Sequence, residues 1–428
     1  MNNEIVLLRK KALQSFLLFI RAEHSTRMPF LRELSLWCGP LPAELSSALK
    51  DLFLELGPLG KLRCLTIDFS ETLLSSDPEL ANAVASLSSL SYLSLCQAKA
   101  ASCDTLENIK SSLESVDIRL IEAWERLSSD ESDYDENISR NGYDKAVDVV
   151  GHLHRFRDTL NDIKLVFPLR SAPDWPVFPR VKRLELDSFY APVTLHYVQA
   201  FPNLVHIVLS EMDDFWDVCD EFFDEYRQCN MEQQAQYRDA WPALKIFEGS
   251  FHALYILALP IHVPRVKIKC IPRSYLDDDS VELAWLDTML ADVRPSHLEV
   301  EVKCVKQFVL SKAFRTALTT ERDHPLKSLG LVLRLSEFDK GLKPDVLMVC
   351  LSFPAVFSYA MWTNHAAALD VDLERAPRDH TLPPFVVSVF SLYRLRRPGR
   401  SALLAYGRSG GGPCYEAPLQ APRAWLQV

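Results

Sequence analysis

The sequence predicts an α/β solenoid in which short parallel strands alternate with helices, and three observations lead to this prediction. Three apolar residues recur with the spacing Φ-x-x-Φ-x-Φ, where Φ is an apolar residue. The copies follow one another at short intervals, and helix-like stretches separate them. Each unit would therefore be a strand followed by a helix, which buries its apolar face only by stacking on its neighbours.

Seven clear copies of the triplet lie between residues 31 and 209. The last two positions alternate along a strand, so both point to one face, and the first position enters the core from the preceding turn. The intervals between last positions are 31, 28 and 23 residues over the first four copies, and 21 and 23 residues over the last three. Leucine-rich repeats run about 20–29 residues, so most intervals fit that class. The copies are Leu31, Leu34, Leu36; Leu62, Leu65, Ile67; Leu90, Leu93, Leu95; Leu113, Val116, Ile118; Leu160, Ile163, Leu165; Val181, Leu184, Leu186; and Leu204, Ile207, Leu209.

Weaker copies, proline positions and helix-like stretches extend the pattern. Proline ends a preceding helix and favours extended geometry at the residue before it. The helix-like stretches include Glu44 to Leu56 and Leu80 to Leu87. An ordinary α/β domain with parallel strands is the alternative fold. The proline pairs are Met28-Pro29, Phe178-Pro179, Phe201-Pro202 and Trp241-Pro242, and the weaker copies are Leu244, Phe247; Val266, Ile268; Leu298, Val300; Leu326, Leu329, Leu331; and Leu369, Val371.

The segment before the repeats is expected to cap them. Residues 1–27 are interpreted as one amphipathic helix whose apolar positions share a face. Covering the first repeat is the expected role of this helix, since terminal repeats need a cap. The repeats themselves are assigned to residues 28–375. The apolar positions of the helix are Leu13, Phe16, Leu17 and Ile20.

An acidic insertion is expected at about residues 127–148. The step from Ile118 to Leu165 is 47 residues, about two repeats, and it holds an acidic run from Ser128 to Glu136. Such composition is typical of a disordered segment. Ser128 and Ser132 each have an acidic residue three positions later, so both are candidate phosphorylation sites. A simple solvated loop is the alternative.

A second acidic segment interleaves aromatic residues with carboxylates between Glu211 and Tyr226. One hypothesis is a surface for a basic protein partner. The alternative is an amphipathic helix with Phe215, Phe222 and Tyr226 toward the core. The candidate partner surface consists of Asp213, Asp214, Trp216, Asp217, Asp220 and Glu221.

The C-terminal segment, residues 376–428, differs from the rest in composition. It has seven Arg, no Lys and only Asp379 and Glu416 as acids, which gives a formal charge of +5. It is also rich in Pro and Gly, and a poorly ordered tail is expected.

Composition disfavours several functional classes. The net charge of −10 disfavours nucleic-acid binding, and no apolar run reaches the roughly 18 residues of a membrane span. The ten cysteines form no C-x-x-C pair, which favours reduced thiols and a cytoplasmic or nuclear location. Gly407 to Gly411 match G-x-S-x-G, but no His follows. We therefore expect no enzyme, and no cofactor or metal site.

Two phrases, Phe178 to Leu186 and Phe201 to Leu209, resemble the F-box and leucine-rich-repeat proteins of mushroom-forming fungi. The resemblance covers roughly Met28 to Leu335, and it concerns the repeats alone. It implies repeats that select a substrate and, where an F-box exists, docking to a Skp-type adaptor of a cullin ubiquitin ligase. Leu41 to Leu45 imitate the opening of an F-box, but they lie between two repeat copies. A repeat helix that starts after a proline is expected there, and an F-box remnant is the alternative.

The expected function is protein binding without catalysis, either as a substrate receptor of a Skp–cullin–F-box ligase or as a free-standing scaffold. Side chains that point away from the core along the strands would line the sheet of the solenoid. Those singled out are Arg32, Arg63, Lys182, Glu185 and His206.

Overall fold

The computed structural model describes residues 5–120, 148–166, 172–187, 193–210, 221–235, 241–269, 280–302, 326–335 and 357–363. All these residues belong to one compact unit, Met1–Leu392. A second unit, Tyr393–Val428, lies outside the described residues.

The unit is built on a single parallel sheet in which strand order equals chain order. The sheet has 13 strands from β1 to β13, and every described pairing is parallel. Parallel neighbours need a crossover between them, and here helices provide many of these crossovers. The strands are β1 (Ile5–Leu7), β2 (Glu33–Leu36), β3 (Cys64–Ile67), β4 (Tyr92–Ala98), β5 (Ser115–Leu120), β6 (Asp162–Val166), β7 (Arg183–Asp187), β8 (His206–Ser210), β9 (Ile246–Ser250), β10 (Arg265–Lys269), β11 (His297–Val302), β12 (Ser328–Leu335) and β13 (Phe357–Thr363).

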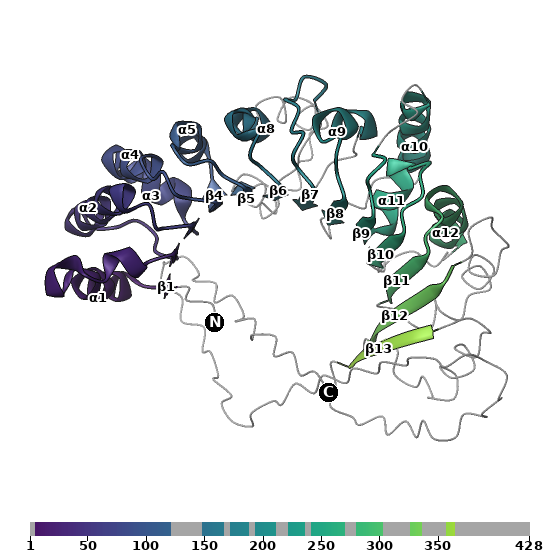
Figure 1. The fold of residues 1–428 in the computed structure, drawn as a ribbon. Coiled ribbons are helices and arrows are strands. Elements are labelled where there is room, and N and C mark those ends of the chain that lie inside the picture. Colours follow the sequence, from purple (N-terminus) through teal and green to yellow (C-terminus); the bar gives the residue numbers. More distant parts are fainter. Residues whose placement is uncertain are drawn as a thin grey trace, which may run out of the picture. The chain divides into compact units, whose positions relative to one another are not determined.

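The described helices lie along one side of the sheet (Figure 1). This alternation of a strand and a helical segment is a solenoid-like arrangement, as the sequence predicted. The α-helices are α1 (Lys10–Arg21), α2 (Ala43–Leu59), α3 (Ser70–Ser76), α4 (Pro78–Ala85), α5 (Ala100–Asn108), α8 (Val149–His152), α9 (Thr194–Ala200), α10 (Glu221–Gln234), α11 (Phe251–Leu257) and α12 (Ser280–Val293). Short 3-10 helices are η1 (Glu23–Ser25), η2 (Met28–Phe30) and η3 (His154–Phe156).

The apolar triplets form the core between sheet and helices. All 21 residues of the seven clear copies are buried, with exposed fractions from 0% to 3%. The strand positions are in register: Leu34, Leu65, Leu93 and Val116 are successive partners across the first repeats. Each buried Leu or Ile contributes roughly 1.5–3 kcal/mol relative to an exposed one, so the triplets make a large contribution to the stability of the stack.

A backbone contact repeats at the start of nearly every strand. The carbonyl oxygen of Arg32 accepts from the N–H groups of Arg63 (2.7 Å) and Cys64 (3.0 Å). The carbonyl oxygens of Arg63 and Lys182 do the same for the pairs that open β4 and β8. Each of these carbonyl oxygens accepts hydrogen bonds from two N–H groups at the start of the next strand. The backbone N–H groups at these positions are therefore hydrogen-bonded within the protein.

The N-terminal segment differs from the single helix expected over residues 1–27. Ile5–Leu7 form strand β1, which pairs with β2, and the helix α1 begins at Lys10. The short run Ile5, Val6, Leu7 finds a partner in the sheet, a tertiary contact that periodicity in this segment does not reveal. The four residues expected on the apolar face, Leu13, Phe16, Leu17 and Ile20, are all buried.

Helix α2 begins directly after Pro42 and includes most of the F-box-like phrase. Its buried positions Leu49, Leu52, Phe53 and Leu56 have helical i, i+3, i+4, i+7 spacing. Gly60 closes the helix with a left-handed φ of 58°. The segment after Pro42 is therefore a helix between strands β2 and β3, and it starts after a proline as expected.

Carboxylates at the starts of helices satisfy helix amides and also connect neighbouring units. Asp77 accepts from the N–H groups of Glu79 (3.0 Å) and Leu80 (3.1 Å) at the start of α4, and from the hydroxyl of Ser46 in α2 (2.6 Å). Glu71 of α3 similarly accepts from the N–H of Ser102 (3.1 Å) in the first turn of α5. These side chains satisfy amides that a helix terminus leaves without partners.

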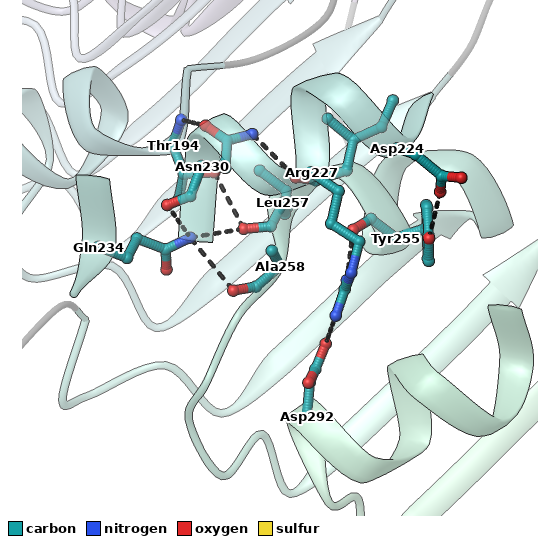
Figure 2. A network of polar contacts seen from close by, with 10 residues as sticks. Thr194, Asp224, Arg227, Asn230, Gln234, Tyr255, Leu257, Ala258 and Asp292 are labelled. Carbon is teal, nitrogen blue, oxygen red and sulfur yellow. Dashed lines mark hydrogen bonds and ion pairs between the residues drawn. The ribbon is translucent and has the colours of Figure 1, made fainter. Parts of the chain in front are cut away.

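A buried cation connects α10, α11 and α12 (Figure 2). Arg227, 7% exposed, donates to the carbonyl oxygen of Tyr255 (2.8 Å) and pairs with Asp292 (2.5 Å). The guanidinium also lies 4.6 Å from the centre of the Tyr255 ring, and the hydroxyl of Tyr255 donates to Asp224 (2.5 Å). Arg227 of α10 therefore contacts the next two helices, α11 and α12.

Two side-chain amides of α10, those of Asn230 and Gln234, form hydrogen bonds at the end of α11 and in the turn that follows it. Gln234 donates to the carbonyl oxygens of Leu257 (2.8 Å) and Ala258 (3.1 Å). Ala258 has a left-handed φ of 48°, and these bonds hold the turn that requires it. Asn230 accepts from the N–H of Thr194 (2.9 Å), which connects α9 to the same cluster.

The remaining expectations about domain organisation fall mostly on undescribed residues. The tail 376–428 and the repeat copy at Leu369 and Val371 lie outside the described residues, as does the acidic insertion except for Asp148. Asp148 caps α8 through the N–H of Gly151 (2.9 Å). The last described strand is β13, which the triplet pattern did not predict.

Candidate functional site

The sheet face opposite the helices carries polar side chains in three rows, one residue per strand in each row. Because side chains alternate along a strand, residues between two buried positions must point to this face. The middle row begins with small hydroxyl residues, Ser35, Thr66 and Ser94, on β2 to β4. From β5 onward it is charged except at Val208 of β8, with Asp117, Lys164, Glu185, Val208, Glu248, Lys267 and Glu299 in register.

The charged rows form ion pairs across neighbouring strands. Lys164 of β6 pairs with Glu185 of β7, which also pairs with Arg183. Further along, His206 lies 3.2 Å from Glu248, and Lys267 lies 3.0 Å from Glu299. Register partners on adjacent parallel strands lie about 4.8 Å apart, so opposite charges in one row meet without backbone adjustment.

These pairs shift the pKa values of the carboxyl groups. Burial acts to raise the pKa of Glu185, but hydrogen bonding and the charges of Lys164 and Arg183 outweigh it, and the pKa is lowered. The hydrogen bond from His206 lowers the pKa of Glu248. Asp162 differs, because desolvation outweighs its contact with Arg183 and raises its pKa. Ion pairing therefore favours the charged forms of Glu185 and Glu248, whereas burial disfavours the charged form of Asp162.

A hollow of about 240 Å3 lies on this face across β3 to β7. It is placed at the carboxyl ends of the strands, where Cys96, Arg119, Val166 and Asp187 are successive register partners. Asp68 directly follows β3 and completes this row. The lining residues are Asp68, Cys96, Gln97, Arg119, Leu120, Lys164, Val166 and Asp187.

A β-bulge in β4 shapes the floor of the hollow. Cys96 pairs with Arg119 but Ala98 pairs with Leu120, so Gln97 is an extra residue in β4. Gln97 adopts a left-handed φ of 56°, a conformation that is uncommon for residues other than glycine. Bulges re-aim side chains at functional edges of sheets, and this one makes Gln97 part of the lining.

Both cations of the hollow are already neutralised within the protein. The guanidinium of Arg119 holds Asp117 with two hydrogen bonds, of 3.2 Å and 2.9 Å, and Lys164 pairs with Glu185. The hydrogen bond to Asp117 raises the pKa of Arg119 further, so its charge is permanent. The carboxylates of Asp68 and Asp187 form no ion pair with another described residue.

Desolvation raises the pKa of Asp68, although Arg119 and a hydrogen bond from Cys96 act to lower it. Burial likewise raises the pKa of Asp187, against the charge of Lys164. The thiol of Cys96 also has a raised pKa, because desolvation disfavours its thiolate. A protonated thiol is a poor nucleophile, so the hollow is suited to binding charged groups rather than to thiol chemistry.

The sequence and the structure point to different residues. Asp213, Asp214, Trp216, Asp217 and Asp220 lie outside the described residues, as do Ser128 and Ser132, so the hypotheses on them remain predictions. Glu221 is the first residue of α10. Near its start, this helix buries Phe223, and Tyr226 packs partly against the core.

Of the five residues expected to line the sheet, Glu185 and His206 lie within strands, in the middle and first rows of the face. Arg32, Arg63 and Lys182 each stand one residue before a strand, where their carbonyl oxygens bind the next repeat.

The hollow was not predicted from the sequence. Asp68, Cys96, Arg119 and Asp187 share one signal, because each follows the last apolar position of its strand by one residue. That position alternates to the face opposite the core. The bulge at Gln97 has no comparable signal.

Within the described residues, no group of three or more His, Cys, Asp or Glu side chains could hold a metal ion. None of the helices described is long and apolar enough to span a membrane. Comparison with protein-family models, with curated proteins and with solved structures finds no match.

Proposed function

We propose that the chain is an irregular leucine-rich-repeat solenoid that binds other proteins through the sheet face opposite its helices, without catalysis. The observation that carries the proposal is the largely polar face, in which one outward side chain per row comes from each successive strand. Buried triplets with one strand per unit support the repeat class.

Stacked repeats create extended faces that suit macromolecular partners. Many outward side chains, including Glu185, Lys164 and Glu248, are half-buried, so a partner can contact them without reordering the backbone. The pairing of these charges fixes their positions before binding, and fixed side chains lose less entropy in a complex.

The test exchanges two ion pairs that lie on different sides of the solenoid. Lys267→Glu/Glu299→Lys reverses a pair on the sheet face, while Lys50→Glu/Glu79→Lys reverses a pair (2.5 Å) between α2 and α4. Both exchanges keep the net charge and the ion pair. Each tagged variant is used for affinity purification with lysine cross-linking and mass spectrometry, beside the unaltered chain.

Cross-links from Lys164 or Lys269 to a co-purified protein, weakened by the sheet exchange only, would support the proposal. Cross-links confined to Lys50 or to Lys110, which follows α5, would contradict it. The same experiment separates two roles for the module. Recovery of a Skp-type adaptor together with a cullin supports a substrate receptor of a ubiquitin ligase, whereas partners without that machinery support a free-standing scaffold.

A further inference from the structure

We propose that the hollow on β3 to β7 binds basic side chains, Lys or Arg, of a protein partner, with Asp68 and Asp187 as the anchoring carboxylates. The inference rests on the proposed function, since it specifies which partner chemistry the sheet face selects. The inference predicts that the partner surface bound in the hollow is basic rather than acidic.

Charge complementarity is the first reason. The lining holds two carboxylates, Asp68 and Asp187, and two cations, Arg119 and Lys164, and each of these cations has a carboxylate partner outside the lining. Because Arg119 and Lys164 are held by Asp117 and Glu185, the excess charge resides on Asp68 and Asp187. An acidic ligand would have to displace an internal carboxylate, whereas a cation meets two carboxylates that form no ion pair within the described part of the chain.

Geometry is the second reason. Asp68 and Asp187 lie at the two ends of a row that crosses five strands, roughly 19 Å at about 4.8 Å per strand. One ammonium group cannot contact both carboxylates over that distance. The hollow therefore fits a partner with at least two basic side chains, about six residues apart if the partner segment is extended at about 3.3 Å per residue.

The energetics of the empty hollow agree with this assignment. Desolvation raises the pKa of both Asp68 and Asp187, so each carboxylate is less stable there than in water. An incoming ammonium or guanidinium group supplies the missing counter-charge in a partly desolvated site, where ion pairs are stronger than at an open surface.

The test measures binding of a fluorescent oligolysine to the full chain by anisotropy, with oligoglutamate as the probe of opposite charge. Asp68→Asn/Asp187→Asn removes the two anchors, and Asp51→Asn/Asp104→Asn removes the same charge from exposed positions on α2 and α5. We expect the sheet variant to weaken oligolysine binding about tenfold, roughly threefold per carboxylate, and the helix variant to change it less than twofold. Equal losses in both variants, or preferential binding of oligoglutamate, would overturn the inference.

Carboxyl labelling of the unaltered chain provides a second readout that does not depend on how the variants fold. Oligoarginine, whose guanidinium groups do not form amides with activated carboxyls, should protect Asp68 and Asp187 from carbodiimide-driven labelling and leave Asp51 and Asp104 unprotected. Labelling that is unchanged at Asp68 and Asp187 would refute the assignment. A cellular partner that cross-links to Lys267 but binds the Asp68→Asn/Asp187→Asn variant normally would overturn this inference alone, and the absence of sheet-face cross-links would overturn the proposed function as well.

Discussion

Replacing Arg227 with Met should open the helices α10 to α12 and leave the first repeats intact. Loss of one partner from a fully buried ion pair costs about 3–5 kcal/mol. Here the side chain of Asp292 is 26% exposed and can regain some hydration, so about 2–3 kcal/mol is expected, including the lost hydrogen bond to the carbonyl oxygen of Tyr255. Met retains the apolar stem of the side chain, which isolates the effect of the charge.

Hydrogen exchange followed by mass spectrometry measures this change locally. Repeats contact mainly their neighbours, so faster exchange should be concentrated in residues 221–293 and be absent from α2 to α4. Arg180→Met is the control, since Arg180 is exposed and donates only to the carbonyl oxygen of Asp158 (3.2 Å). Arg227→Met/Asp292→Met should recover part of the loss, because no unpaired charge remains. Equal acceleration throughout the chain, or none, would refute the reasoning.

Three further changes test the packing and the site. Asp77→Ala should lower the free energy of unfolding by about 1–2 kcal/mol in urea titrations, because the cap of α4 is lost. The hydrogen bond from Ser46 lowers the pKa of Asp77, so the stabilisation by its carboxylate is present above the unfolded-state pKa and disappears as pH falls through the folded-state pKa. A destabilisation by Asp77→Ala that stays the same at low pH would contradict this prediction. Gly249→Ala should cost about 1–3 kcal/mol in thermal unfolding, since its Cβ would lie 2.7 Å from the carbonyl oxygen of Leu209. Gly39→Ala, which has open space around it, is the control and should be near neutral. Similar melting temperatures for the two variants would argue against a steric clash at Gly249. Asp187→Asn should raise the urea midpoint at pH 7, because burial raises the pKa of the Asp187 carboxyl group and the folded state therefore favours a neutral side chain. This gain in stability should vanish below the unfolded-state pKa, where Asp187 is protonated in both states. A lower midpoint at pH 7 would show that the carboxylate stabilises the fold.

The core of the fold could be predicted from the triplets, because buried positions in a stacked repeat leave a periodic apolar signal. Leu34, Leu65 and Leu93 occupy equivalent places for that reason. β1 could not be predicted, since three apolar residues have no local preference that distinguishes a strand from a helix start. Its conformation is set by pairing with β2, which is a tertiary contact.

The local geometry around proline was predicted less well. The residue before proline was expected to be extended, yet Trp241 has a left-handed φ of 47°. Its buried indole donates to the carbonyl oxygen of Phe201 (2.9 Å), and the side chain is 1% exposed. Packing of a large ring and one hydrogen bond thus outweigh a backbone preference of about 1–2 kcal/mol, a balance that the sequence does not reveal.

The candidate site was largely hidden from the sequence because its chemistry depends on which charges remain unpaired. Asp117 and Asp187 are the same residue type at outward strand positions. Only the structure shows that Arg119 neutralises Asp117 while Asp187 stays without an ion partner among the described residues. A charge pattern read along the chain does not show which pairs form, because a partner can lie two residues away in the same strand or on a neighbouring strand.

The identity of strand order and chain order has a consequence for how such a chain changes in evolution. Asp68 and Asp187 belong to different repeats, and gaining or losing one repeat between them would move them apart or together by one strand spacing, about 4.8 Å. The order and direction of the other strands would not change, since each added strand would be inserted between two parallel neighbours. The number of strands between two binding residues thus sets the distance between them, and this distance can be matched to the spacing of two groups on a partner by changing the number of repeats.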